Sequence, residues 1–304
     1  MPKKIRIGVD LGGTKIEVIG MSPNGKELVR RRLPTPPGYE PTLDAIANLV
    51  AEVEQITGSE GTVGVGIPGT IVPETELVKN ANSVWLNGQP LGRDLEERLD
   101  RSVRIANDAN CFVLSEAIDG AAKGAPVVFG VIVGTGVGGG ITVNGECLPG
   151  VNLVAGEWGH NPLPWAAPDE YPGPNCYCGR QGCIEMWVSG PGFEQDHQLR
   201  SGAKLPAPDI VRAATAGEPI ASMSLSLYCD RLARSLASLV NVLDPDVIVL
   251  GGGMSNVPEL PQRVSEIVPR YVLAAGATSL DLRTRFVRAM HGDSSGVRGA
   301  ARLW

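Results

Sequence analysis

The stretch IRIGVDLGGTKIEVIGMS (5–22) decides the fold, because VVFGVIVGTGVGGGITVNG (127–145) repeats its plan. Each stretch is an apolar strand-like run, a glycine-rich turn and a second strand-like run, which predicts a β-hairpin. A chain of 304 residues is long enough for two cores. The duplicated unit therefore predicts two lobes.

Strands and helices alternate along the rest of the chain, which indicates the α/β class. Further strands are expected at 62–69, 103–108 and 247–253. Apolar periodicity predicts helices at 40–57, 94–99, 109–124, 219–244 and 294–304. Residues 146–195 are rich in Pro, Gly and Trp and predict an irregular elaboration of the second lobe.

Composition excludes several classes of partner. The formal net charge of −6 gives no broad basic surface, so nucleic acid is not expected as a partner. The beginning, MPKKIRIGVD, runs directly into a strand without a signal-peptide core, and no run reaches the length of a membrane span. These features predict a cytoplasmic protein with no membrane partner, in which backbone amides or a metal hold any anionic ligand.

The first glycine turn, GVDLGGTK (8–15), nearly matches the phosphate loop GxxxxGK[ST]. The order of its last two residues is reversed, however, and a strand follows in place of a helix, so that motif is excluded. An ordinary hairpin turn is the alternative, but two adjacent glycines beside Asp and Lys favour phosphate binding. Backbone amides, two side-chain donors and a carboxylate for Mg²⁺ would come from Asp10, Gly12, Gly13, Thr14 and Lys15.

The second turn, GTGVGG (134–139), fits the dinucleotide motif GxGxxG. That motif must open a helix, whereas ITVNG (141–145) reads as a strand. We expect instead a second hairpin that faces the first and clamps a polyphosphate between the lobes. Gly251, Gly252 and Gly253 follow a buried strand and would offer adenosine a surface free of side chains.

IANDAN (105–110) places Asn107 and Asp108 where a strand meets a helix. Asp is a common helix N-cap, so Asp108 could serve only to satisfy backbone amides. It could equally be a general base, because α/β proteins bind ligands at the carboxyl ends of their strands. The local sequence gives these two interpretations equal weight.

NCYCGRQGC (175–183) places three cysteines within eight residues. Tetrahedral zinc needs a fourth N or S ligand, and His160 lies in the same irregular region. We therefore expect zinc bound by His160, Cys176, Cys178 and Cys183. A redox pair is the rival interpretation, but it more typically has CxxC spacing. The other cysteines are expected to be small core residues: Cys111, Cys147 and Cys229.

Glu157 precedes His160 by three residues, and Glu185 follows Cys183 by two. A zinc-bound loop would hold both carboxylates and the imidazole in one place, where they could accept hydrogen bonds from sugar hydroxyls. The alternative is that both glutamates are simply exposed to solvent.

Taken together, the motifs resemble the ROK family, the bacterial sugar kinases grouped with repressors and open reading frames. The likeness covers essentially the whole chain, and it rests on seven motifs in the family's order: GVDLGGTK (8–15), GIPGT (66–70), NDAN (107–110), VGTGVGGG (133–140), GEWGH (156–160), CYCGRQGCIE (176–185) and LDPDVIVLGGG (243–253). The longer strings NANSVWLNGQPL (80–91), GEWGHNPLPW (156–165) and HGDSSGVRGAARLW (291–304) are most similar to those of proteobacterial fructokinases.

The resemblance implies an actin-like, ribonuclease-H-like fold and ATP-dependent phosphorylation of a hexose, most readily fructose, with glucokinase and N-acetylglucosamine kinase as alternatives. It implies a small lobe, 1–108, completed by a helix at 293–304, and a large lobe, 109–292. A homodimer is also implied. The family includes repressors with a helix-turn-helix, for which we expect no room before the first strand.

The same resemblance gives each residue a role. Asp108 would be the catalytic base, and His160 would bind zinc through one nitrogen and sugar through the other. Further sugar contacts would come from Gly69, Asn107, Glu157 and Glu185. The phosphates would be faced by Asp10, Gly12, Gly13, Thr14, Lys15, Gly134, Thr135, Gly136 and Gly139.

Overall fold

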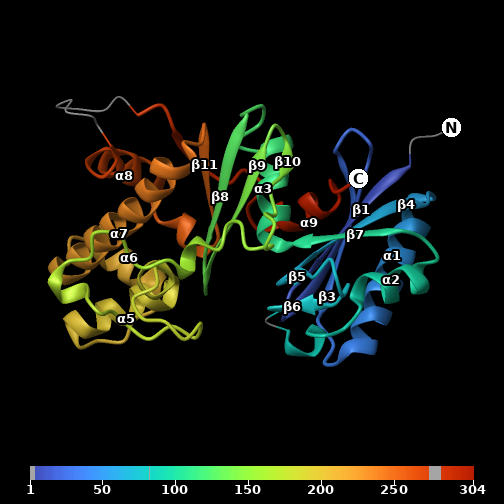
Figure 1. Cartoon of the computed structure of the whole chain (residues 1–304), viewed down its shortest axis with the longest axis horizontal. Helices are drawn as coiled ribbons and strands as arrows, with labels where there is room; N and C mark the ends of the chain where they lie inside the picture. The colour runs from blue at the N-terminus through green and yellow to red at the C-terminus, as the bar shows by residue number, and fades with distance from the viewer. Residues whose placement is uncertain (1–3, 82, 274–281) are drawn as a thin grey trace.

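The computed structural model describes residues 4–81, 83–273 and 282–304. Two lobes lie side by side, each built around a five-stranded sheet, as Figure 1 shows. This arrangement confirms the two-lobed α/β architecture expected from the duplicated hairpins.

The first sheet has the strand order β3-β2-β1-β4-β7. β1 pairs antiparallel with β2 and parallel with β4, and β4 pairs parallel with β7. The strands of this sheet are β1 (Ile5–Leu11), β2 (Lys15–Met21), β3 (Glu27–Pro34), β4 (Gly61–Ile67) and β7 (Val103–Asn107). A separate two-stranded sheet pairs β5 (Thr70–Ile71) with β6 (Val78–Lys79). Its accompanying helices are α1 (Tyr39–Thr57), η1 (Val84–Leu86) and α2 (Leu91–Leu99).

The second sheet, ordered β10-β9-β8-β11-β12, repeats the topology of the first. β8 pairs antiparallel with β9 and parallel with β11, and β11 pairs parallel with β12. Its strands are β8 (Val127–Val133), β9 (Val137–Val143), β10 (Glu146–Cys147), β11 (Val247–Gly251) and β12 (Arg285–Arg288). The two glycine turns therefore occupy equivalent places, between the first and second strands of each sheet.

Two helices cross between the lobes. α3 (Asp108–Ile118) follows β7 of the first sheet but packs on β8 and β9 of the second. α9 (Ser295–Ala300), which comes after β12, packs on β1 and β4 of the first sheet and against α3. A Cβ at Gly299 would lie 1.7 Å from the carbonyl oxygen of Cys111, so only glycine allows this close crossing. The two lobes are thus joined at their centre.

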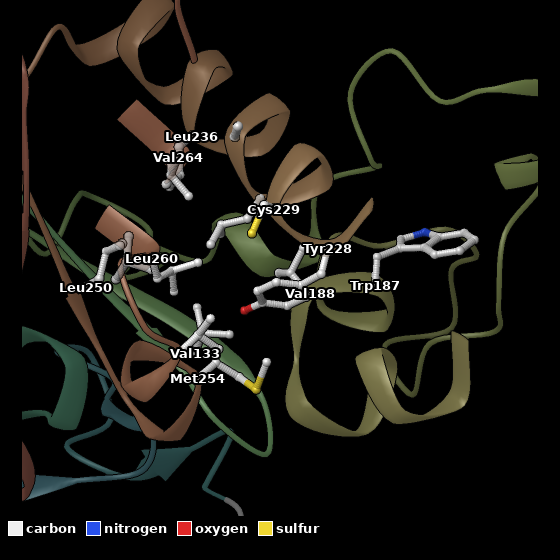
Figure 2. Packing of buried hydrophobic residues seen from close by; sticks show 14 of the residues in the cluster. Val133, Trp187, Val188, Tyr228, Cys229, Leu236, Leu250, Met254, Leu260 and Val264 are labelled. Atoms are coloured by element: carbon white, nitrogen blue, oxygen red, sulfur yellow. The ribbon is translucent and has the colours of Figure 1, made fainter. Parts of the chain in front are cut away.

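The large lobe buries its core beneath the long helix α7 (Pro219–Leu243), where Leu236, Cys229 and Tyr228 meet residues of β8 and β11 (Figure 2). Cys111 and Cys229 are buried and Cys147 is partly buried, which confirms the small-core-residue interpretation. The remaining elements of this half are η2 (Trp158–His160), η3 (Pro168–Glu170), α4 (Glu185–Val188), α5 (Gly190–Ser201), α6 (Ala207–Thr215), η4 (Gly253–Asn256), α8 (Leu260–Ile267), η5 (Val268–Arg270) and η6 (Gly292–Ser294). In the part of the chain that the structure describes, no helix is long and apolar enough to cross a membrane.

Several element boundaries differ from the expectations. The helix predicted at 109–124 ends at Ile118, because turns centred on Gly120 and Gly124 follow it. The strand predicted at 62–69 ends at Ile67, and the helical tail predicted at 294–304 contains only the short α9. The region 146–195 is less irregular than expected, since α4 and the beginning of α5 lie within it.

Candidate active site

Asn107 and Asp108 lie at the junction of β7 and α3, as predicted. Asn107 is the helix N-cap: its side-chain oxygen accepts hydrogen bonds from the backbone amides of Ala109 at 2.9 Å and Asn110 at 3.3 Å. The N-cap interpretation of Asp108 is therefore wrong, because the preceding residue already fills that position. The Oδ1 atom of Asp108 accepts a hydrogen bond from the Ala109 amide at 2.8 Å.

Three carboxylates from different segments lie near this junction: those of Asp108, Asp10 and Glu157. Loss of hydration raises the pKa of Asp108 to about 6; the Ala109 amide opposes this shift, and the charge of Glu157 adds to it. Loss of hydration also raises the pKa of Asp10 to about 6, helped by the charges of Asp108 and Glu17. A carboxylate with a pKa near 6 is ionised at neutral pH and is a better proton acceptor than an ordinary aspartate.

The turn of the first hairpin exposes Gly13 and Thr14 to solvent, while the Gly12 amide closes the turn on the Lys15 carbonyl at 2.9 Å. The Nζ atom of Lys15 lies 3.9 Å from Oε2 of Glu17. Glu17 is fully buried and also pairs with Arg30 and Arg32, a cluster that the sequence analysis missed. With its side chain 38% exposed and this one long ion pair, Lys15 can turn to a phosphate.

The turn of the second hairpin exposes Thr135 and Gly136 and is fixed by groups outside it. The carbonyl of Gly134 accepts the Gly190 amide at 2.8 Å, and the Val137 amide donates to Glu185 Oε2 at 2.8 Å. The structure places Gly139 inside β9, where an added Cβ would lie 2.9 Å from the Trp158 ring. Packing therefore accounts for Gly139, and the exposed amides of the turn lie at 135 and 136.

A cavity of about 390 Å³ opens beside the end of β11. Its walls are Gly251, Gly252, Ser255, Asn256, Arg288, Ala289, Met290, His291, Gly292 and Asp293. An added Cβ would meet the Phe112 ring at Gly251 and the Val133 carbonyl at Gly252, so the fold itself requires these two glycines. At Gly253 it would meet nothing within 4 Å. Packing therefore does not require the third glycine, and Gly253 is not among the residues that line this cavity.

Glu116 of α3 binds two of the residues that line this cavity, Met290 and His291. The sequence analysis missed this residue. Its buried carboxylate accepts the amides of Met290 at 3.0 Å and His291 at 3.1 Å and the hydroxyl of Ser295 at 2.7 Å. Its signal in the sequence was a glutamate that comes two residues after the apolar run CFVL (111–114).

The four residues predicted to bind zinc come together. One ligand atom from each of His160, Cys176, Cys178 and Cys183 lies within 4.8 Å of all the others. The Sγ atoms of Cys178 and Cys183 are 3.6 Å apart, and His160 Nδ1 is 3.6 Å from Cys176 Sγ. Thiolates bound to one tetrahedral zinc at about 2.3 Å lie about 3.8 Å apart, so this donor set fits zinc. The three cysteines are free of disulfides, as the zinc interpretation requires.

The two glutamates predicted to bind sugar differ in their exposure to solvent. Glu185 is buried at the start of α4, whereas Glu157 is exposed beside η2. The interpretation of both glutamates as merely exposed is therefore wrong for Glu185. Gly69 receives a hydrogen bond from the Asn107 side-chain amide to its carbonyl at 3.3 Å, which ties it to the junction.

Tyr177 is a residue of this site that the sequence analysis missed. Its hydroxyl lies 3.0 Å from His160 Nε2, the ring nitrogen that points away from the cysteines. Loss of hydration, together with the negative charges of Glu185, Cys176 and Glu157, raises the pKa of Tyr177 to about 12. Its position between two predicted metal ligands was the signal that could have identified it.

Comparison with known proteins places these features in context. The ROK family model matches residues 6–304. The chain is 43% identical over 304 residues to an N-acetyl-D-glucosamine kinase of Escherichia coli O157:H7, covering 97% of this chain and 98% of that protein. The fold is similar to that of a ROK hexokinase from Thermus thermophilus, with a TM-score of 0.84 and 32% identity over 98% of this chain and 96% of that one. It is also similar to a ROK family glucokinase from Streptomyces griseus, solved with glucose and AMPPNP, with a TM-score of 0.79 and 30% identity over 98% of each chain.

Proposed function

This chain belongs to the ROK family, and we propose that it is an ATP-dependent sugar kinase that phosphorylates a hydroxyl group of a hexose. The observation that carries the proposal is the gathering of Asp10 and Asp108, each with a pKa raised to about 6, beside a glycine turn with exposed amides. Such a site offers a proton acceptor and a phosphate cradle together.

In the proposed reaction, the sugar oxygen attacks the γ-phosphorus of ATP in line with the bond that breaks to release ADP. Asp108 accepts the proton of the attacking hydroxyl. Asn107 holds the Gly69 loop against the sugar, and the other proposed sugar contacts are Glu157, His160 and Glu185. Little covalent chemistry is asked of the protein, so positioning and charge stabilisation supply most of the rate.

The nucleotide is proposed to lie across the two glycine turns. The exposed backbone of Gly13, Thr14, Thr135 and Gly136 faces the phosphates, together with the side chains of Thr14, Lys15 and Thr135. Gly12 and Gly134 shape the turns, since their amides bond to the carbonyls of Lys15 and Gly136. Asp10 holds Mg²⁺ through water. When bound, Mg²⁺ neutralises charge on the phosphates. The cavity beside Gly251, Gly252 and Gly253 would take the adenosine.

Zinc is proposed as a structural metal held by His160, Cys176, Cys178 and Cys183. Four protein ligands complete a tetrahedral site and leave no position for an activated water. The loop would then carry His160 and Glu185 to the sugar. We also propose the division into lobes given above, 1–108 with 293–304 and 109–292, and a homodimer.

The choice of hexose rests on the relatives. The compared proteins are named for N-acetyl-D-glucosamine, for glucose and, more broadly, as a hexokinase. Fructose was expected from three sequence strings, and these relatives do not support that preference. We propose that N-acetylglucosamine and glucose are better substrates than fructose.

The test is a coupled assay for ADP formation with purified protein and a panel of N-acetylglucosamine, glucose, mannose and fructose. Sugar-dependent ADP formation that Asp108→Asn abolishes supports the kinase, and the order of kcat/KM values decides the substrate. If no sugar of the panel stimulates ADP formation, the proposed function is wrong.

A further inference from the structure

Three basic side chains share one buried carboxylate on the first sheet. Glu17 is fully buried, and its Oε1 atom accepts a hydrogen bond from Arg30 Nη1 at 3.0 Å while Oε2 accepts one from Arg32 Nε at 2.8 Å. The Nζ atom of Lys15 lies 3.9 Å from Oε2 of the same residue. Arg30 also pairs with Glu27 at 2.7 Å. Three cations therefore face two carboxylates, and one positive charge of this cluster is not neutralised within it.

The guanidinium of Arg32 is only partly engaged by protein groups. Its side chain is 46% exposed, and its Nε and Nη2 atoms both donate to one oxygen of Glu17. No acceptor in the described part of the chain meets its Nη1 atom. Arg30, by contrast, also binds Glu27 and the hydroxyl of Ser294, the latter at 2.6 Å. A guanidinium presents five donors in a planar fork, so one edge of Arg32 can bind an anion while the other stays on Glu17.

Arg32 lies between the two proposed parts of the nucleotide site. At one end, Arg30 binds Ser294, which directly follows Asp293 in the wall of the cavity proposed for adenosine. At the other end, Lys15 begins β2 at the turn proposed for the phosphates. Arg30 and Arg32 are two residues apart on β3, so their side chains share one face, and Arg32 is the nearer of the two to that turn. The order from cavity to turn is thus Arg30, Arg32, Lys15.

The face that carries Arg32 is the one that borders the junction of the lobes. Arg32 lies in the same row of the sheet as Asp10, the carboxylate proposed for Mg²⁺, with one strand between them. An added Cβ at Gly296 of α9 would lie 3.4 Å from Asp10 Oδ2, so α9 covers this face, and α9 also packs on α3. Arg31 points to the opposite face, where it pairs with Glu52 of α1.

We propose that Arg32 is a further nucleotide-binding residue, whose free guanidinium edge donates hydrogen bonds to the β-phosphate of ATP and of the product ADP. The inference rests on the proposed function and deepens it. With adenosine in the cavity and the γ-phosphate at the turn, the phosphate that passes Arg32 is the middle one. Arg32 would then bind phosphate by its planar fork, while Lys15 acts as a point charge at the turn.

Calorimetric titration of ADP and AMP into wild type and Arg32→Gln tests this contact. We expect the Kd for ADP to rise about tenfold, because a charge-assisted hydrogen bond is lost, and the Kd for AMP to change less than about twofold. The loss should be the same in EDTA and in Mg²⁺, since the contact is direct. Arg30 and Lys15 still neutralise Glu17, so the variant should fold, and denaturant unfolding checks this. Arg31→Gln, one residue away on the opposite face, is the matched control.

Chemical labelling of the wild type gives a measurement that needs no variant. An arginine-specific dicarbonyl reagent is applied, and the modified peptides are quantified by mass spectrometry. ADP should protect Arg32, and AMP should not. The extent of modification at Arg31, which the proposed site does not contact, should be the same with either nucleotide.

The other outcomes identify which idea has failed. Unchanged ADP affinity in Arg32→Gln, or no protection of Arg32 by ADP, overturns the inference. Equal losses for ADP and AMP would mean that Arg32 does not recognise the β-phosphate. A loss seen only with Mg²⁺ would mean that Arg32 acts through Asp10 and the metal instead of touching the nucleotide. A wild-type protein that binds neither ADP nor ATP refutes the proposed function itself.

Discussion

The two hairpins share one topology but differ in the origin of their polar groups. The β1–β2 hairpin carries its own charges, with Asp10 beside Asp108 and with Lys15 paired to Glu17. The turn of the β8–β9 hairpin carries no charged side chain. A carboxylate contacts it from another element: Glu185, at the start of α4, accepts a hydrogen bond from the Val137 amide. The two hairpins therefore share a topology but obtain their charged groups from different parts of the chain.

The two groups of contacts in the proposed site should therefore depend on different parts of the chain. The charged half of the site should fail when a side chain on its own sheet or junction is changed. The sugar contacts supplied by the cysteine loop, Glu185 and His160, should fail when that loop is disturbed at a distance from them. The predictions below test this division.

Asp108→Asn should have the largest effect, lowering kcat by about 10²-fold or more, because the amide cannot accept the proton. The protein should stay folded, since Asn107 and not Asp108 caps α3. Its free energy of unfolding at pH 7 should rise, because the substitution removes a charge whose pKa the fold raises. Steady-state kinetics and denaturant unfolding measure both effects, with Asp100→Asn, at an exposed position after α2, as control. Near-normal turnover would restrict Asp108 to a structural role.

Sequence patterns predicted the duplicated hairpins and the four-residue metal cluster because both are local: a glycine turn or a cysteine spacing occupies one short stretch. They missed Glu116, Glu17 and Tyr177, whose roles depend on partners distant in sequence or on the direction of a side chain. Glu116, for example, meets residues 174 and 175 positions away. The N-cap assignment failed by one residue, since either Asn or Asp could cap the helix and only the backbone dihedrals distinguish them.

Cys178→Ser tests whether the sugar contacts depend on the cysteine loop. Loss of one thiolate should remove zinc, loosen His160 and Glu185, and raise the sugar KM about 30-fold while KM for ATP changes less than about threefold. Elemental analysis and separate titrations of both substrates measure this, with Cys147→Ser, outside the cluster, as control. Full zinc content, or normal sugar kinetics without zinc, would contradict the scaffold role.

The pH dependence tests the charged half. With pKa values near 6 for Asp108 and Asp10, kcat/KM should fall below pH 6 and approach a loss of about a hundredfold per pH unit, because both carboxylates must be ionised. Stability should move the other way. The folded protein binds these protons more tightly than the unfolded chain, so their contribution to the free energy of unfolding rises as pH falls from about 7 to 4. A pH–rate profile and unfolding curves across this range measure both, and an acid limb centred near pH 4 would contradict the raised pKa values.

Lys15→Ala and Thr135→Ala compare the two turns directly and should have the smallest effects. Lys15 brings a full charge to the phosphates, so its loss should raise KM for ATP about tenfold. Thr135 adds one neutral hydroxyl to a turn whose exposed amides remain, so its loss should raise KM for ATP only about threefold. The sugar KM should change less than about twofold in both variants, as measured by titrating each substrate at saturation of the other. Equal effects of the two variants on ATP would remove the distinction between a charged and an uncharged hairpin, and an effect confined to the sugar would remove the phosphate assignment from both.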